Sequence, residues 1–247
     1  MPNLSVAQSR DQPLDLIKWL AIITMLLDHT RLVWPSLSGL AVIGRWAFPL
    51  FCLAIAANVY RARQNPLWQR KNARYLGYML LFALISEYPY HLLSPQSITF
   101  NIMPTLAMGL LLCWCVAYSN CYHMLFGLLL IACAYQYSTQ LMYGWLGVLL
   151  PAACLLAITY GRKLWWLAAL IAALANVVYD ASFAVALQQA QPISLISAAL
   201  ATVFGLGLLW QRPRLPPITP VGHWGYWFYP LHLLALYLLG SLITMIV

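Results

Sequence analysis

Charged side chains are scarce in this 247-residue chain, making up only 7% of it, whereas ordinary soluble domains carry about 25%. Five residues are acidic and thirteen are lysine or arginine, while 63% of the chain is hydrophobic and the mean hydropathy is +0.77. Apolar runs of about twenty residues, the length needed to cross a bilayer, follow one another with short breaks. The composition excludes an ordinary soluble domain and predicts an all-α, polytopic integral membrane protein.

Paired cysteines and internal repeats are also lacking. The six cysteines lie within or beside apolar segments, and only Cys113-x-Cys115 places two of them close together. We interpret them as small buried side chains and expect no metal site. Without a clear internal repeat, the chain lacks a feature that many secondary transporters show.

Nine transmembrane helices are predicted, and the weakest evidence is for the fifth. Their approximate ranges are 14–33, 40–60, 75–93, 101–118, 123–137, 141–160, 163–180, 192–210 and 224–246. Residues 1–13 are interpreted as a polar cytoplasmic segment without the pattern of a cleavable signal peptide, and residues 14–247 as a single membrane domain. Residues 181–191 are moderately apolar and are a candidate tenth element, either short or re-entrant.

The distribution of basic residues predicts the orientation. Ten of the thirteen are expected on the side of the N-terminus: Arg10, Arg61, Arg63, Arg70, Lys71, Arg74, Arg162, Lys163, Arg212 and Arg214. Of the remaining three, only Arg31 is assigned to an outer loop. Because basic residues in short loops stay in the cytoplasm, the N-terminus is predicted inside and the C-terminus outside. This bias also accounts for the net charge of +8, so no nucleic-acid partner is expected.

The first predicted span contains an unusual set of ionisable groups. Lys18 and His29 are eleven residues apart, close to three helical turns, and therefore share one helix face at a separation of about 16 Å. Ionisable groups inside a span are functional candidates. The alternative is that Lys18 extends its amine to the near interface while Asp28 and His29 lie in the far headgroup layer.

The same depth is expected for Arg45, which enters from the outer side in the second span. Asp28, His29 and Arg45 could therefore meet in the outer half of the membrane. A histidine there can act as general base, and an arginine can stabilise an oxyanion. Asp28 either orients His29 or pairs with Arg45. The set fits acyl transfer to an amine or a hydroxyl group.

Further candidates fall into two groups by depth. On the inner side, phosphates of a donor could bind Lys18, Asn58, Arg61 and Arg74, although basic inner loops are common in membrane proteins. On the outer side, Glu87 and Asp180 are candidate substrate-binding residues or ordinary interface residues. His232, deep in the last span, is either a substrate ligand or a core histidine bonded to a neighbouring helix.

Several of these motifs resemble a known family. They are Asp15-Leu-Ile-Lys18, Asp28-His29, Gly44-Arg45-x-Ala47-Phe48-Pro49, Asn58 and Phe228-Tyr229-x-x-His232. Together they are similar to the TraX family of F-type conjugative pilin acetylases, and the basic-x10-His pattern resembles the acyltransferase-3 superfamily. Residues 101–191 contribute no matching motif.

The resemblance implies a multi-pass N-acetyltransferase of the bacterial inner membrane. Acetyl-CoA would be the co-substrate, the N-terminal amine of a pilin would be the acceptor, and Tyr229 and His232 would contact the substrate. Three alternatives remain: O-acetylation of an envelope glycan, a proton-coupled transporter that uses Asp28, Glu87 and Arg45, and a structural factor in pilus assembly.

Overall fold

The computed structural model describes residues 11–177 and 192–246, and every regular element in those ranges is a helix. The all-α prediction is therefore confirmed for the described part of the chain. In chain order the elements are α1 (Gln12–Val33), the 3-10 turn η1 (Pro35–Leu37), α2 (Leu40–Gly44), α3 (Ala47–Ala62), α4 (Arg70–Leu93), α5 (Ile102–Ala117), α6 (Cys121–Gln136), α7 (Gly144–Tyr160), the 3-10 turn η2 (Gly161–Leu164), α8 (Trp165–Ala175), α10 (Pro192–Gln211) and α11 (Trp224–Ile246).

Helix α1 begins and ends where local chemistry dictates. The Asp11 side chain accepts a hydrogen bond from the Leu14 backbone N–H at 3.3 Å, and a proline occupies the first turn, where its missing N–H costs nothing. At the other end Trp34 is extended ahead of Pro35, as expected for a residue before proline. The helix therefore starts two residues earlier than predicted and ends at the predicted residue.

The second predicted span, 40–60, is not one continuous helix. Helix α2 ends at Gly44 and α3 begins at Ala47. Pro49 explains this interruption, because its ring conflicts with the carbonyl four residues earlier and it has no N–H to donate. That earlier residue is Arg45, which consequently lies at the corner between the two helices.

The predicted span 163–180 also differs from the structure. Helix α8 ends at Ala175, and the Asn176 side chain donates to the Ala172 carbonyl at 2.8 Å. The candidate tenth element at 181–191 and the last residues of the predicted span lie outside the described residues.

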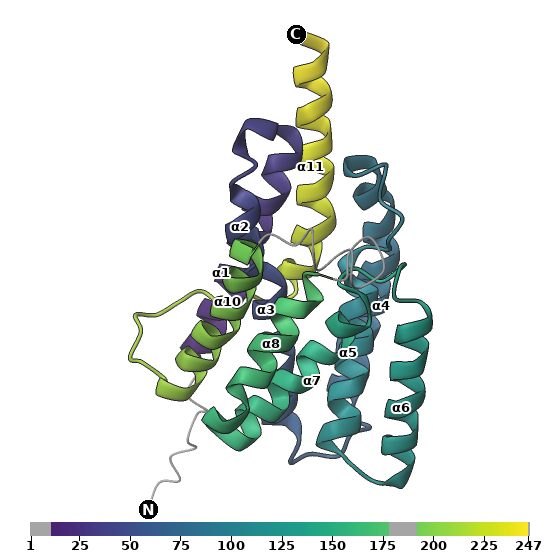
Figure 1. The fold of residues 1–247 in the computed structure, drawn as a ribbon, viewed down its shortest axis with the longest axis vertical. Coiled ribbons are helices and arrows are strands. Elements are labelled where there is room, and N and C mark those ends of the chain that lie inside the picture. Colours follow the sequence, from purple (N-terminus) through teal and green to yellow (C-terminus); the bar gives the residue numbers. More distant parts are fainter. Residues whose placement is uncertain (1–10, 178–191, 247) are drawn as a thin grey trace, which may run out of the picture.

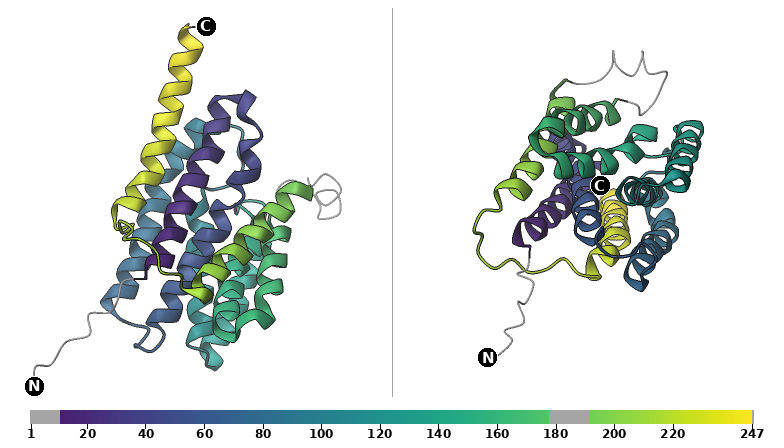
Figure 2. Two further views of the ribbon diagram at one scale, coloured as in Figure 1. Left: turned by 90° about the vertical axis from the view of Figure 1, so that its left-hand side faces the viewer. Right: turned by 90° about the horizontal axis from the view of Figure 1, so that it is seen from below.

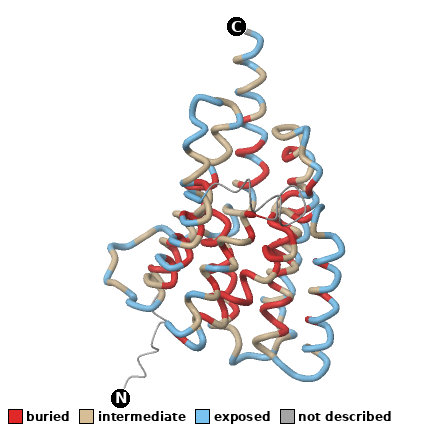
Figure 3. The backbone as a smooth tube through the Cα atoms, in the orientation of Figure 1, coloured by how far each residue is buried: buried red, intermediate tan, exposed pale blue. Residues whose placement is uncertain are grey.

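Helix α3 lies at the centre of the bundle. It packs against α1, α5, α7 and α10, and most of its residues are buried. Helix α11, from the other end of the sequence, packs between α1 and α4 (Figures 1 and 2). The buried residues gather around α3, α5 and α7, whereas α6 and the far end of α11 are largely exposed and the far end of α1 is half-buried (Figure 3). The core therefore joins the first, central and last helices of the chain.

The helices differ in height as well as in burial. The upper ends of α1, α4 and α11 rise above the level at which α5 and α7 begin (Figure 1). At that level the Phe100 N–H donates to the Gln140 carbonyl at 2.8 Å, which joins the two loops that precede α5 and α7. These two loops lie below the upper ends of α1, α4 and α11.

Within the described ranges, four helical stretches are long and apolar enough to cross a membrane: Leu40–Ala62, Gly144–Ala175, Pro192–Gln211 and Trp224–Met245. Helices α5 and α6 are apolar but shorter, and α1 carries four charged residues. The chain is thus a membrane protein. The count of nine spans and the orientation with the N-terminus inside stay predictions.

Candidate active site

Two cavities lie along α1, one beside Lys18 and one beside His29. The Lys18 cavity has a volume of about 170 Å³ and is lined by α1, α3, α4, α5, α11 and the segment that leads into α11. The histidine cavity has a volume of about 560 Å³ and is lined by α1, the α2–α3 corner and the loops before α5 and α7. A single helix therefore presents Lys18 to one cavity and His29 to the other.

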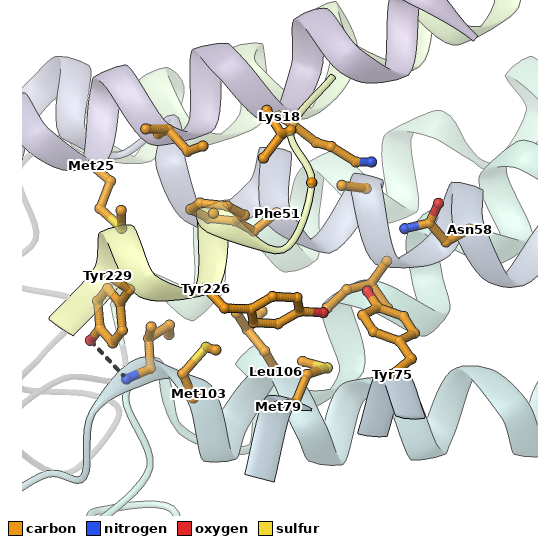
Figure 4. Close-up of a pocket in the computed structure, with 17 residues that line it drawn as sticks. Lys18, Met25, Phe51, Asn58, Tyr75, Met79, Met103, Leu106, Tyr226 and Tyr229 are labelled. Carbon is orange, nitrogen blue, oxygen red and sulfur yellow. Dashed lines mark hydrogen bonds between the residues drawn. The ribbon is translucent and has the colours of Figure 1, made fainter. Parts of the chain in front are cut away.

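The Lys18 cavity is polar at one end and apolar at the other. Figure 4 shows the amine of Lys18 pointing toward Asn58, with the hydroxyl groups of Tyr75 and Tyr226 nearby. Asn58 and Tyr75 line this polar end of the cavity. The opposite end is closed by Met25 and other bulky side chains (Figure 4). Such a cavity suits an extended chain with a polar head.

The two cavities share part of their lining. Met25, Phe51, Ile102 and Tyr229 contribute to both, and we call these four residues the shared wall. The hydroxyl of Tyr229 accepts a hydrogen bond from the Ile102 backbone N–H at 3.5 Å (Figure 4). Tyr229, expected to contact a substrate, thus lies between the cavities and holds the first turn of α5.

His29 is bonded to a histidine on the last helix. Its Nδ1 lies 2.7 Å from Nε2 of His232, and the two rings meet edge to edge, with centroids 5.0 Å apart and planes 21° from parallel. The other nitrogen of His232, Nδ1, donates to the Phe228 carbonyl at 2.8 Å. His29 lines the histidine cavity, whereas His232 is only 6% exposed and lines neither cavity. Of the two alternatives for His232, the geometry is that of a histidine bonded to a neighbouring helix.

Asp28 has a partner that the sequence analysis did not consider. Its Oδ1 accepts a hydrogen bond from Arg31 Nε at 2.9 Å, one helical turn away. The backbone of Gly44 lies directly against the Asp28 side chain, leaving no room for a Cβ atom at position 44. Arg45 lines the same cavity. The three residues expected to meet, Asp28, His29 and Arg45, therefore do surround one space.

Glu87 lines neither of these cavities. Its Oε2 accepts hydrogen bonds from the backbone N–H, at 3.1 Å, and the side-chain amide of Asn101, while its Oε1 lies 3.0 Å from Nε2 of His91. Asn101 is fully buried, caps α5 and also donates to the Ala83 carbonyl at 2.7 Å. The carboxylate expected to bind substrate thus joins α4 to the start of α5.

The remaining predicted residues divide by location. Asn58 lines the Lys18 cavity, but Arg61 and Arg74 do not. Arg61 lies 3.8 Å from the Asp11 carboxylate in an exposed pair. Asp180 lies outside the described residues. Within the described ranges, no group of three histidine, cysteine, aspartate or glutamate side chains is arranged to hold a metal ion.

Hydroxyl groups on the wall of the histidine cavity were not anticipated. Tyr90 and Ser97 oxygens lie 2.6 Å apart, Tyr90 and Thr99 oxygens 2.9 Å apart, and Ser97 and Thr99 oxygens 3.0 Å apart. All three residues line the cavity. The polar run before α5 was the available signal, but it is also ordinary loop composition.

Comparison with known proteins identifies one family. A family model described as TraX protein matches residues 13–240. Among curated proteins, an uncharacterised protein of Rickettsia prowazekii (strain Madrid E) is 29% identical over 105 residues. That match covers 42% of this chain and 38% of the relative, so it spans well under half the length of the curated protein. No solved structure matches the chain.

Proposed function

The chain belongs to the TraX family, and from this membership and the two cavities we propose that it is an acetyl-CoA-dependent membrane acetyltransferase. The acetyl group moves from the cytoplasmic side to an acceptor at the opposite face of the bacterial inner membrane. The proposed acceptor is the N-terminal amine of a pilin. The observation that carries the proposal is that the Lys18 cavity and the histidine cavity meet at the shared wall.

The Lys18 cavity fits the arm of coenzyme A rather than the whole cofactor. At about 170 Å³ it is smaller than the roughly 300–1,000 Å³ typical of a pocket that encloses a complete small ligand. The nucleotide would therefore stay outside, with its phosphates near the Lys18 ammonium, where charge-assisted hydrogen bonds are strong. The amide-containing arm would pass Asn58 and Tyr75, and the thioester would reach the shared wall.

Chemistry would take place where the thioester meets His29. His29 accepts a proton from the acceptor amine as the amine nitrogen attacks the thioester carbonyl. The tetrahedral oxyanion forms in the cavity that Arg45 lines, where a fixed positive charge stabilises it. The C–S bond then breaks, and the sulfur leaves with the proton held by His29. The products are the acetylated amine and coenzyme A with a free thiol.

The histidine cavity supports an acceptor on the far side from Lys18. It is more than three times larger than the Lys18 cavity, about 560 Å³ against about 170 Å³, and hydroxyl and charged side chains line it. Such a space admits the end of a peptide. A glycan hydroxyl would undergo the same reaction, so a measurement must decide between a peptide amine and a glycan hydroxyl as the acceptor.

The test is acetyl transfer by the purified protein in detergent or nanodiscs, with labelled acetyl-CoA and a synthetic peptide that carries a pilin N-terminus. His29→Ala should reduce turnover about 10²- to 10⁴-fold, the usual contribution of a general base. His123→Ala is the matched control, because His123 lies on α6 and lines neither cavity. Correctly inserted His29→Ala protein with undiminished transfer would overturn the proposal.

Acceptor class is tested by mass spectrometry of surface pilin and envelope glycans from cells with and without the protein. A gain of one acetyl group on the pilin amine supports the proposal. A gain confined to glycan hydroxyl groups would mean that the protein is an O-acetyltransferase. If liposomes that contain the protein take up a solute together with protons, and the protein does not bind acetyl-CoA, the protein is a transporter and the proposal is wrong.

A further inference from the structure

The geometry points to His232 as a positioning residue, which holds His29 in the tautomer that leaves its Nε2 atom able to accept a proton. This inference rests on the proposed function, because it concerns the histidine that would act as general base. It assigns the orientation of His29 to a residue on α11 rather than to the neighbouring aspartate. His232 is placed behind His29, and so it acts through His29 instead of touching a substrate.

The proton on His232 is located by its partner. A carbonyl oxygen can only accept a hydrogen bond, so the Nδ1 atom of His232, 2.8 Å from the Phe228 carbonyl, must be the donor. In a neutral imidazole one nitrogen donates and the other accepts. Since His232 is buried and stacked on Phe228, where an ionised ring is costly, it is neutral, and its Nε2 atom is the acceptor.

The proton on His29 follows from that assignment. His29 Nδ1 lies 2.7 Å from the accepting Nε2 of His232, so His29 donates from Nδ1. A neutral His29 then carries its lone pair on Nε2. Because His29 lines the histidine cavity and His232 does not, the lone pair belongs to the ring that substrates can reach. The chain from the Phe228 carbonyl through His232 fixes one tautomer of His29.

The ring of His232 is itself held in place. It stacks on Phe228 with centroids 4.9 Å apart and planes 11° from parallel, and its edge is hydrogen-bonded to His29. Both of its nitrogens have a partner. Asp28, the alternative orienting group, has one carboxylate oxygen bonded to Arg31. These contacts support His232 as the group that orients His29.

The experiment compares three variants of the purified protein at two positions. His232→Ala should lower kcat for acetyl transfer at least about twofold, because a single net hydrogen bond is worth about a tenfold change in the ratio of the two tautomers, which takes a ratio of about 10:1 to about 1:1. The KM for acetyl-CoA should not change, since His232 lines neither cavity. His232→Gln should recover most of the lost kcat, because a glutamine oxygen can accept the hydrogen bond from His29. His123→Gln serves as the control.

A second measurement reads the tautomer directly. The ¹⁵N spectrum of histidine-labelled protein should show His29 protonated at Nδ1 and bare at Nε2, with the signals assigned by their loss in His29→Gln. In His232→Ala the two tautomers should mix. Melting curves recorded in detergent identify any variant that has merely unfolded. The ¹⁵N spectrum of the wild type reports the tautomer of His29 without any variant that could unfold.

The outcomes separate this inference from the proposed function. Suppose that His29→Ala abolishes transfer. If folded His232→Ala and His232→Gln are then both as active as the wild type, or if both lose activity to the same extent, the positioning role is wrong and the acetyltransferase stands. A wild-type His29 protonated at Nε2 would also overturn the inference. If His29→Ala retains full activity, the proposed function itself fails.

Discussion

Replacing Gly44 with alanine tests the tight contact between α2 and α1 beside the candidate active site. A Cβ atom at position 44 would overlap the Cβ, carboxyl carbon and Oδ1 of Asp28. Asp28 cannot swing away freely, because its Cβ is part of the overlap and its Oδ1 is bonded to Arg31. The backbone of α2 or α1 must therefore shift.

The expected loss of stability can be bounded with a matched variant. Gly77 lies in α4, and a Cβ atom at that position would have no other atom within 4 Å, so Gly77→Ala should gain about 0.5–1 kcal/mol from helix propensity alone. Gly44→Ala adds an overpacking cost of about 1–3 kcal/mol. At about 2–4 °C per kcal/mol for a chain of this size, Gly44→Ala should melt roughly 2–12 °C below Gly77→Ala.

Melting can be followed in detergent with a thiol-reactive fluorophore once the exposed cysteines have been blocked, because Cys52, Cys113, Cys115 and Cys154 are buried and react only on unfolding. Acetyl transfer by the same samples should fall in Gly44→Ala, since Asp28 is adjacent to His29. If Gly44→Ala melts at or above the temperature of Gly77→Ala, α2 does not press against Asp28 and the reasoning fails.

Three further outcomes are expected. Lys18→Gln should raise the KM for acetyl-CoA about 10- to 150-fold with little change in kcat, because a charge-assisted contact worth about 1.5–3 kcal/mol is lost. A change confined to kcat, or an equal change in the control Lys163→Gln, would contradict a phosphate role. Glu87→Gln should lower the melting temperature without changing the acceptor KM, because it weakens the hydrogen bonds to Asn101. A raised acceptor KM at unchanged melting temperature would instead indicate that Glu87 binds the substrate. If the C-terminus is outside, an alkaline phosphatase reporter fused after α11 should be active and a fluorescent protein fused there should be dark. The reverse pattern would show that the C-terminus is in the cytoplasm.

Local features of the sequence predicted the first helix and the location of its candidate residues. Helical spacing alone put Lys18 and His29 on one face of α1, and each lines a cavity in the structure. The depth of Arg45 was estimated by counting from the outer surface, and it lines the cavity of His29. These predictions depended on the geometry of a single helix or on the common thickness of the membrane.

Contacts between helices distant in the sequence could not be predicted in the same way. His29 and His232 are 203 residues apart, and no spacing rule states that α11 packs between α1 and α4. The partner of Glu87 was hidden for the same reason, although Asn101 was visible as the first residue of a span. Arg31 is different: its pairing with Asp28 is a local i,i+3 contact, which was missed because Arg31 was assigned to a loop.

The shared wall has a consequence for the membrane as a whole. An enzyme whose two reactants come from opposite sides needs an opening from each side, and two openings that joined would conduct water and protons. Met25, Phe51, Ile102 and Tyr229 line both cavities with one thioether, one aliphatic and two aromatic side chains. In the proposed enzyme, the same four residues that bring the reactants together would also insulate the membrane, so their size would set a limit on proton leakage as well as on what can pass.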